Sequence, residues 1–251
     1  MPAEAGIQCK LWRREGQKDW IPACAGMTER ETASASSRGS LHFMRIILAS
    51  TSPRRREILA LLGLPFEVIA PGFDELPSPD RPIEEEVLDF AAGKAASVAA
   101  KNPESIVIGS DTMILIHGEK IGKPTDSAGA KQMLRSLSGK THRIFTSVAI
   151  VDGSGGPGLR MVEQVAVTMR AYAEKEIEDY LACGESLDKA GAYSIQGRGR
   201  GLIESIDGDY LAAVGLPLAP IAGYLQSRGI SAPLNVEKLY SEKSYLNWRS
   251  F

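Results

Sequence analysis

Hydrophobic and polar positions alternate along residues 44–230 in blocks that switch between the period of a strand and that of a helix. Short apolar runs at 46–48 and 106–108 are typical of buried strands, whereas 83–101 repeats apolar residues every three or four positions. The pattern predicts strand 45–50, helix 53–62, strand 66–70, helix 83–101, strand 105–109 extended through 112–116, helix 126–137, hairpin strands 142–151 and 160–170, helix 173–182, a strand pair within 201–214 and helix 217–228. This order indicates an α/β fold with parallel and antiparallel strand pairing.

Capping residues support two of these helices. Ser52 precedes Pro53 at the start of the first helix, and Gly63 follows its end. Asp126 is placed to cap the helix that stops near Gly139.

Residues 1–43 and 231–251 differ from the central block. Residues 1–43 show no sustained period and repeat the pattern Pro-Ala-x-Ala-Gly at 2–6 and 22–26. We expect 1–43 to be a disordered extension without a functional role, with Met44 as the true start, and 44–230 to be the folded domain. Residues 231–251 also lack a clear period, and we expect an appended tail.

Composition excludes several classes of protein. With 43% hydrophobic residues, the 251-residue chain can build a proper core, but no apolar run approaches the roughly 18 residues of a membrane span. A net charge of −2 gives no global field for nucleic acid, so any anion site is local. The three cysteines lack metal-ligand spacing and indicate a reducing cytosol, and only three histidines are present. A metal would therefore have oxygen ligands.

Candidate chemistry begins with the segment 48–57. Three arginines follow Ser52 and Pro53 in the first helical turn, where the helix dipole disfavours positive charge. An anion bound by backbone N–H groups, hydroxyls and guanidinium groups would reverse that penalty. A solvated basic patch is the alternative for this segment alone.

Three further segments place polar residues where apolar elements end. Asp111 follows the buried run 106–108, and Lys123 lies between a glycine and a proline. Alone, the aspartate is typical of a turn and the lysine of an exposed loop. Segment 188–197 mixes charged, amide and small residues. Together, Arg54, Arg55, Lys94, Lys123 and Lys189 could neutralise a polyphosphate, while Glu75 and Asp111 could bind a divalent cation or activate water. The chain has no Gly-x-x-x-x-Gly-Lys-Ser/Thr motif, which excludes a P-loop enzyme.

Six motifs in order give a family resemblance over residues 45–229. They are Leu48-Ala49-Ser50-x-Ser52-Pro53-Arg54-Arg55, Gly109-Ser110-Asp111-Thr112, Gly122-Lys123-Pro124, Leu137-Ser138-Gly139-x-x-His142 with Thr146, Asp188-Lys189-Ala190-Gly191-x-Tyr193-x-Ile195-Gln196-Gly197, and Val214-Gly215-Leu216-Pro217-Leu218. The chain resembles the Maf family of nucleoside triphosphate pyrophosphatases. One departure is Ala212, where many members have asparagine.

The resemblance implies a mixed-sheet fold like that of inosine triphosphate pyrophosphatases, with two lobes around a deep cleft. It implies hydrolysis of a nucleoside triphosphate to the monophosphate and pyrophosphate with Mg²⁺ or Mn²⁺. By the same resemblance Asp111 is the proton acceptor, Lys94, Lys123, Lys189 and Glu75 line the phosphate and metal site, and Glu75 and Asp111 hold the metal. Ser50, Ser52, Arg54, Arg55, Thr112 and Gln196 match positions that bind or select the substrate.

Thr112 and Gln196 make this chain similar to the members that act on dTTP and UTP. The alternatives are a 7-methyl-GTP pyrophosphatase of the same family and a nucleotide-binding regulator of cell division without turnover. We expect a cytoplasmic enzyme with a nucleoside triphosphate substrate and no membrane or stable nucleic-acid partner. The resemblance suggests a homodimer.

Overall fold

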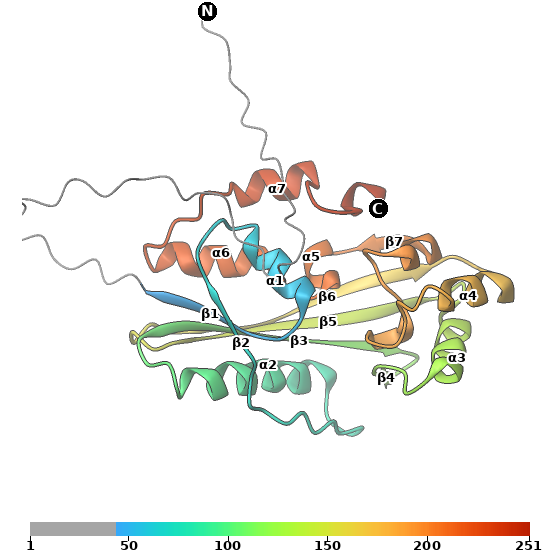
Figure 1. Ribbon diagram of the computed structural model, residues 1–251, viewed down its shortest axis with the longest axis horizontal. Helices are drawn as coiled ribbons and strands as arrows, with labels where there is room; N and C mark the ends of the chain where they lie inside the picture. The colour runs from blue at the N-terminus through green and yellow to red at the C-terminus, as the bar shows by residue number, and fades with distance from the viewer. Residues whose placement is uncertain (1–43) are drawn as a thin grey trace, which may run out of the picture. The chain divides into compact units, whose positions relative to one another are not determined.

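A single mixed sheet forms the centre of the protein. The structure, a computed structural model, describes residues 44–251, so the expectations for residues 1–43 fall outside the described part. The seven strands run in the order β2 (Glu67–Ile69), β1 (Arg45–Ala49), β3 (Ser105–Ile116), β5 (Thr141–Asp152), β6 (Leu159–Met169) and β7 (Ile203–Asp207), with β4 (Glu119–Ile121) paired to the far end of β3 (Figure 1). The predicted α/β class with mixed pairing is confirmed. A division into two lobes stays a prediction.

The two kinds of pairing follow from the sequence patterns. β1 lies parallel to β2 and β3, and its residues 46–49 are buried, as expected for a strand covered on both faces. The long strands β3, β5 and β6 are antiparallel neighbours. β5 and β6 form the predicted hairpin, whose turn contains Gly155 and Gly158, both with positive φ.

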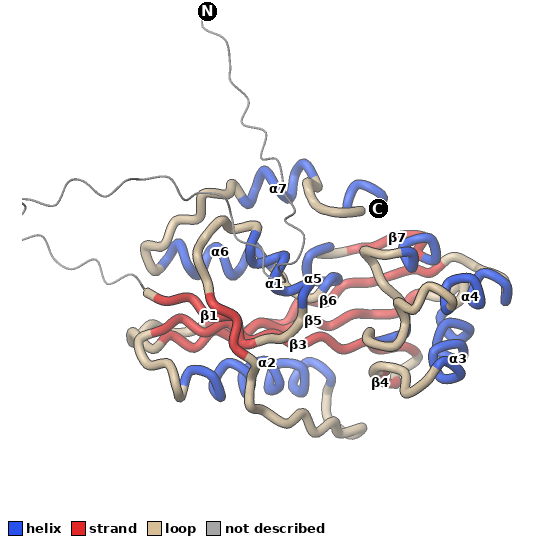
Figure 2. Tube along the Cα trace, viewed as in Figure 1, coloured by secondary structure: helices blue, strands red, loops and turns tan. Residues whose placement is uncertain are grey.

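Helices cover both faces of the sheet. Helix α2 (Ile83–Ala99) packs on one face, and α1 (Pro53–Ala60), α5 (Tyr210–Val214) and α6 (Leu218–Ser227) lie on the other, with α7 (Val236–Glu242) outside α6 (Figures 1 and 2). Helices α3 (Ser127–Leu137) and α4 (Glu174–Leu181) pack together near the far end of the long strands. Within residues 44–251, no helix combines the length and the apolar character needed to cross a membrane.

Gly109 sets the distance between α2 and the sheet. A Cβ atom at this position would lie 2.2 Å from the carbonyl oxygen of Ala91 and 2.9 Å from the backbone nitrogen of Ala95. Such a contact is impossible, so only glycine lets β3 and α2 approach this closely. The close approach brings Lys94 of α2 to Asp111 of β3, two residues beyond the glycine.

The predicted helix starts are confirmed. Ser52 caps α1 by accepting from the backbone nitrogen of Arg55, and Asp126 caps α3 by accepting from that of Gly129 at 2.7 Å. The predicted extension of the third strand is also confirmed, because β3 runs unbroken through residues 105–116. The short strand β4 was missed, although it follows a tight turn at His117 and Gly118, both of which have positive φ.

The prediction of a strand pair within 201–214 is wrong in its second half. β7 pairs with β6, but the chain then turns into helix α5, whose first N–H groups are capped by the carboxylate of Asp209. All five residues of α5 are buried. A short helix buried on every side has no polar face, so its sequence reads like a strand.

The expectation that residues 231–251 form an appendage also differs from the structure. Leu239 and Trp248 are buried in the main core, and the ring of Trp248 stacks on Tyr210 with centroids 5.3 Å apart. The segment has no period because its contacts come from single large side chains rather than from one continuous face.

Candidate active site

A cavity of about 650 Å³ collects the sequence-predicted site residues. Its walls come from the β1–α1 loop, the loop before α2, the middle of α2 and of β3, the segment after β4, the region 188–196 and the end of α5. Every candidate residue lines it: Ser50, Ser52, Arg54, Arg55, Glu75, Lys94, Asp111, Thr112, Lys123, Lys189 and Gln196. Their placement is therefore common to one site, while their individual roles stay predictions.

An ammonium group between two carboxylates lies in this cavity. Lys94 Nζ is 2.5 Å from Asp111 Oδ1 and 2.6 Å from Glu75 Oε1. The side chains of Lys94 and Asp111 are only 8% and 9% exposed, whereas that of Glu75 is 45% exposed. Asp111 thus lies deep in a mid-strand position, not in the turn that its sequence context also allowed. Glu75 reaches the same ammonium from the loop at the rim.

Burial raises the pKa of the Asp111 carboxyl above its ordinary value. The positive charges of Lys94 and Arg55 act in the opposite direction, and Glu75 adds to the rise. A carboxylate with an elevated pKa is a stronger base, which suits proton abstraction near neutral pH. The direction of this pKa shift is the one that the predicted role of Asp111 as proton acceptor would need.

The donor set fits a hard divalent cation. Among the described residues no group of three or more Asp, Glu, His or Cys side chains is arranged around a common point. Mg²⁺, however, is commonly held by one or two carboxylates together with substrate phosphates and water. Glu75 and Asp111 converge on one ammonium and so supply two such carboxylates within one cavity.

The β1–α1 loop is fixed by its own hydroxyl groups. Ser50 Oγ accepts from the backbone nitrogen of Ser52 at 3.1 Å, and Ser52 caps the helix. Arg55 turns inward, because its Nε donates to Gly215 O at 2.9 Å and its Nη2 donates to Thr112 Oγ1 at 3.1 Å. Burial lowers the pKa of this guanidinium. Arg55 therefore ties the loop to β3 and to the end of α5.

Two cationic side chains of the cavity have no hydrogen-bond or ion-pair partner in the described part of the chain. Arg54 and Lys123 make no side-chain hydrogen bond or ion pair with other residues of 44–251. Lys189 instead donates to Asp188 Oδ1 at 2.5 Å and to Glu185 O at 2.9 Å. Unpaired cations beside a cavity are available to an anionic ligand at no cost in broken contacts.

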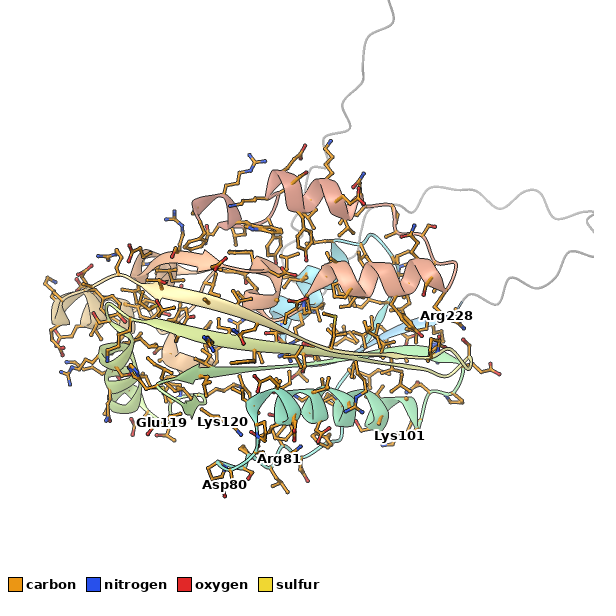
Figure 3. The ribbon with its side chains drawn as sticks, turned by 180° about the vertical axis from the view of Figure 1, so that it is seen from behind. Asp80, Arg81, Lys101, Glu119, Lys120 and Arg228 are labelled. Carbon is orange, nitrogen blue, oxygen red and sulfur yellow. The ribbon has the colours of Figure 1, made fainter. Side chains whose placement is uncertain are left out.

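A buried ion pair anchors the loop that carries Glu75. Glu86 on α2 is fully buried, accepts from the backbone nitrogen of Ser78 and pairs with Lys120 of β4. Lys120 Nζ also donates to Ser78 O at 2.7 Å. Figure 3 shows Lys120 near the start of α2, on the same side of the sheet as the loop residues Asp80 and Arg81.

The range matched by a family model covers the whole candidate site. The model described as "Maf-like protein" matches residues 45–228, which contain every candidate site residue. The chain belongs to the Maf family. The match ends one residue after α6, so α7 and the residues after it lie outside the matched range of this Maf protein.

Three relatives of this Maf protein carry the name dTTP/UTP pyrophosphatase. A dTTP/UTP pyrophosphatase of Moorella thermoacetica is 45% identical over 186 residues, which are 74% of this chain and 96% of the relative. Proteins of the same name from Deinococcus radiodurans and Dictyoglomus thermophilum are 44% and 43% identical over 188 and 187 residues, covering 75% and 74% of this chain and 95% and 97% of the relatives.

Several residues that build the site of this Maf protein were missed from the sequence. Tyr193 lines the cavity and its hydroxyl lies 2.7 Å from His142 Nε2, both side chains being buried. Tyr245 and Asn247 hydrogen-bond to Gln196 from the C-terminal segment. Tyr193 lies inside a motif and could have been found there, whereas the other two lie in a segment without any recognisable pattern.

Proposed function

We propose that this Maf protein is a pyrophosphatase that hydrolyses dTTP and UTP to the monophosphate and pyrophosphate. The observation that carries the proposal is the buried Asp111–Lys94 pair in a cavity whose walls also hold Arg54, Lys123 and Lys189. A base placed among several cations is what hydrolysis of a polyphosphate requires. The names of the relatives support the same reaction and the same two substrates.

In this mechanism Asp111 removes a proton from the attacking water. The water oxygen forms a bond to the α-phosphorus while the bond from that phosphorus to the bridging oxygen breaks. The leaving pyrophosphate takes the electron pair of that bond, and Asp111 keeps the proton. Arg54 and Lys123 bind the phosphate oxygens, and their charge stabilises the negative charge that grows on the leaving group.

A divalent cation, Mg²⁺ or Mn²⁺, would be held by Glu75 and Asp111. When bound, it would neutralise phosphate charge and help to orient the triphosphate. The fit of two converging carboxylates to such an ion supports this part of the proposal. We expect EDTA to stop turnover and added Mg²⁺ or Mn²⁺ to restore it.

Selection of the base rests on Thr112 and Gln196. The amide of Gln196 offers both a donor and an acceptor at the cavity wall, which suits the edge of a pyrimidine that carries both. Thr112 is held between Arg55 and the hydroxyl of Thr146, 3.1 Å from each. A 7-methyl-GTP pyrophosphatase is the alternative within the family, and a glutamine here gives no charge to pair with a cationic purine.

The cellular setting is part of the same proposal. The proposed substrates, dTTP and UTP, occur in the cytoplasm, and we place the enzyme there. A homodimer is proposed from the family resemblance alone, and no stable nucleic-acid complex is expected, because the chain carries a net charge of −2. Size-exclusion chromatography with light scattering measures the oligomeric state.

Pyrophosphate release from dTTP, UTP, CTP, GTP and 7-methyl-GTP tests the function. We expect metal-dependent release that favours dTTP and UTP. Asp111→Asn should lower kcat by roughly 10²- to 10⁴-fold, as loss of a general base does, while nucleotide binding survives. Turnover centred on 7-methyl-GTP would overturn the substrate, and folded protein without turnover of any nucleotide would favour the binding regulator.

A further inference from the structure

The C-terminal segment, residues 236–251, is built into the body of the protein. Trp248 is 7% exposed and stacks on Tyr210 with a 15° angle between the rings. The hydroxyl of Tyr210 donates to Leu246 O at 2.7 Å. Two kinds of contact, stacking and hydrogen bonding, thus fix the backbone around residues 245–248 against α5.

From this fixed position the C-terminal segment holds Gln196 twice. Gln196 Nε2 donates to the hydroxyl of Tyr245 at 3.1 Å, and Asn247 Nδ2 donates to Gln196 O at 2.7 Å. Gln196 lines the cavity, whereas the cavity walls include neither Tyr245 nor Asn247. The segment therefore contacts both the side chain and the backbone of Gln196 from outside the cavity.

The hydrogen bond to Tyr245 leaves the amide oxygen of Gln196 and one Nε2 hydrogen for a ligand. Among residues 44–251, Gln196 Oε1 has no hydrogen-bond partner, and one of the two Nε2 hydrogens is engaged by Tyr245. Uracil and thymine present an N–H group between two carbonyl oxygens, whereas cytosine presents a ring nitrogen acceptor beside an amino group. When the amide oxygen of Gln196 is held in place, it accepts a hydrogen bond from the ring N–H of uracil or thymine. In cytosine it faces the lone pair of the ring nitrogen, which repels it.

We propose that Tyr245 and Asn247 are positioning residues for base recognition: they hold Gln196 so that its amide distinguishes uracil and thymine from cytosine. The proposal rests on the proposed pyrophosphatase function. Both residues lie outside the range matched by the family model, whereas Gln196 lies inside it.

The test compares kcat/KM for UTP and CTP, which differ only at the base edge. Tyr245→Phe keeps the ring and removes the hydroxyl. Asn247 has a φ of 63°, so Asn247→Gly removes the donor in a backbone conformation that glycine adopts without strain. We expect each variant to lower the UTP/CTP ratio about fivefold, the usual effect of one hydrogen bond. Partial unfolding lowers both rates equally and leaves the ratio unchanged.

Two comparisons separate positioning from a general structural effect. Gln196→Ala should lower the ratio further, and Tyr245→Phe added to Gln196→Ala should cause no additional loss. Tyr172→Phe is the matched control, because it removes a hydroxyl that donates to Leu134 O at 2.6 Å outside the cavity, and its ratio should equal that of the wild type.

Three results would overturn the proposal. An unchanged ratio in both Tyr245→Phe and Asn247→Gly, with a wild-type enzyme that prefers UTP, rejects the positioning role and leaves the function intact. An equal loss of ratio with and without Gln196 shows that Tyr245 acts elsewhere. A wild-type enzyme that hydrolyses neither nucleotide rejects the proposed function, and this proposal with it.

Discussion

The buried pair of Glu86 and Lys120 gives a quantitative test of how the Glu75 loop is held. Removing one partner of a buried ion pair generally costs about 3–5 kcal/mol of unfolding free energy. Glu86 is fully buried, but the side chain of Lys120 is 18% exposed and keeps its bond to Ser78 O. For Glu86→Gln we therefore expect a loss below that range, about 2–3 kcal/mol. For Lys120→Met, which leaves a fully buried carboxylate unpaired, we expect the full cost.

Differential scanning calorimetry at pH 7 measures these effects. At 2–4 °C per kcal/mol for a domain of this size, Glu86→Gln should lower Tm by roughly 4–12 °C. The double variant removes both charges and should lose less than the sum of the single variants, by at least about 1.5 kcal/mol. Arg81→Gln is the control, because its pair with Asp89 also ties the loop to α2 but is 39% and 51% exposed, and such pairs contribute less than about 1 kcal/mol (Figure 3). Additive single effects, or an unchanged Tm for Glu86→Gln, would refute the reasoning.

Three further predictions follow from the packing and charge of the site. Gly109→Ala should push α2 from the sheet, lowering stability by at least roughly 1–3 kcal/mol and kcat with it, as chemical unfolding and steady-state assays would show. Burial lowers the pKa of His142 to about 4. Because the unfolded chain then binds more protons, the protein should lose about 2–3 kcal/mol of stability between pH 7 and pH 4.5, and urea unfolding of His142→Gln should show a smaller loss. Arg54→Ala should raise KM for the nucleotide with Tm unchanged, whereas Arg55→Ala should lower both Tm and kcat; equal behaviour of the two variants would contradict their different contacts.

The sequence predicted those elements whose signals are local. Ser52 and Asp126 are capping residues whose side chains bond to the first turn of the helix that follows, so they predicted the starts of α1 and α3. The structure contains both helices and both capping hydrogen bonds. Helix α5 was missed, because burial on every side removes the alternation that separates helix from strand. The packing of Trp248 was missed for a different reason: its partner, Tyr210, lies 38 positions earlier in the chain.

The residues of the candidate site also divide into those with a local sequence signal and those without one. Asp111, Lys123 and Gln196 belong to motifs of consecutive residues, and each lies in the cavity. Glu86 and Tyr245 act on the site only through tertiary contacts, and nothing near them in sequence indicates a partner. A helix-face glutamate is ordinarily solvated, so its full burial could not be inferred from its position.

The hydrogen-bonded pairing of β1 with β3 can change only by whole residues, so the residues that these strands bring to the site cannot shift by small amounts. Ala49 pairs with Gly109, so the β1–α1 loop and Asp111 leave this ladder at neighbouring points. Shifting one strand by a residue would displace the loop by about 3.3 Å and turn its side chains to the opposite face. Intermediate alignments of the two strands do not exist, so the cavity forms only in one register. Buried residues such as Ile47 and Val107, which do not line the cavity, fix that register.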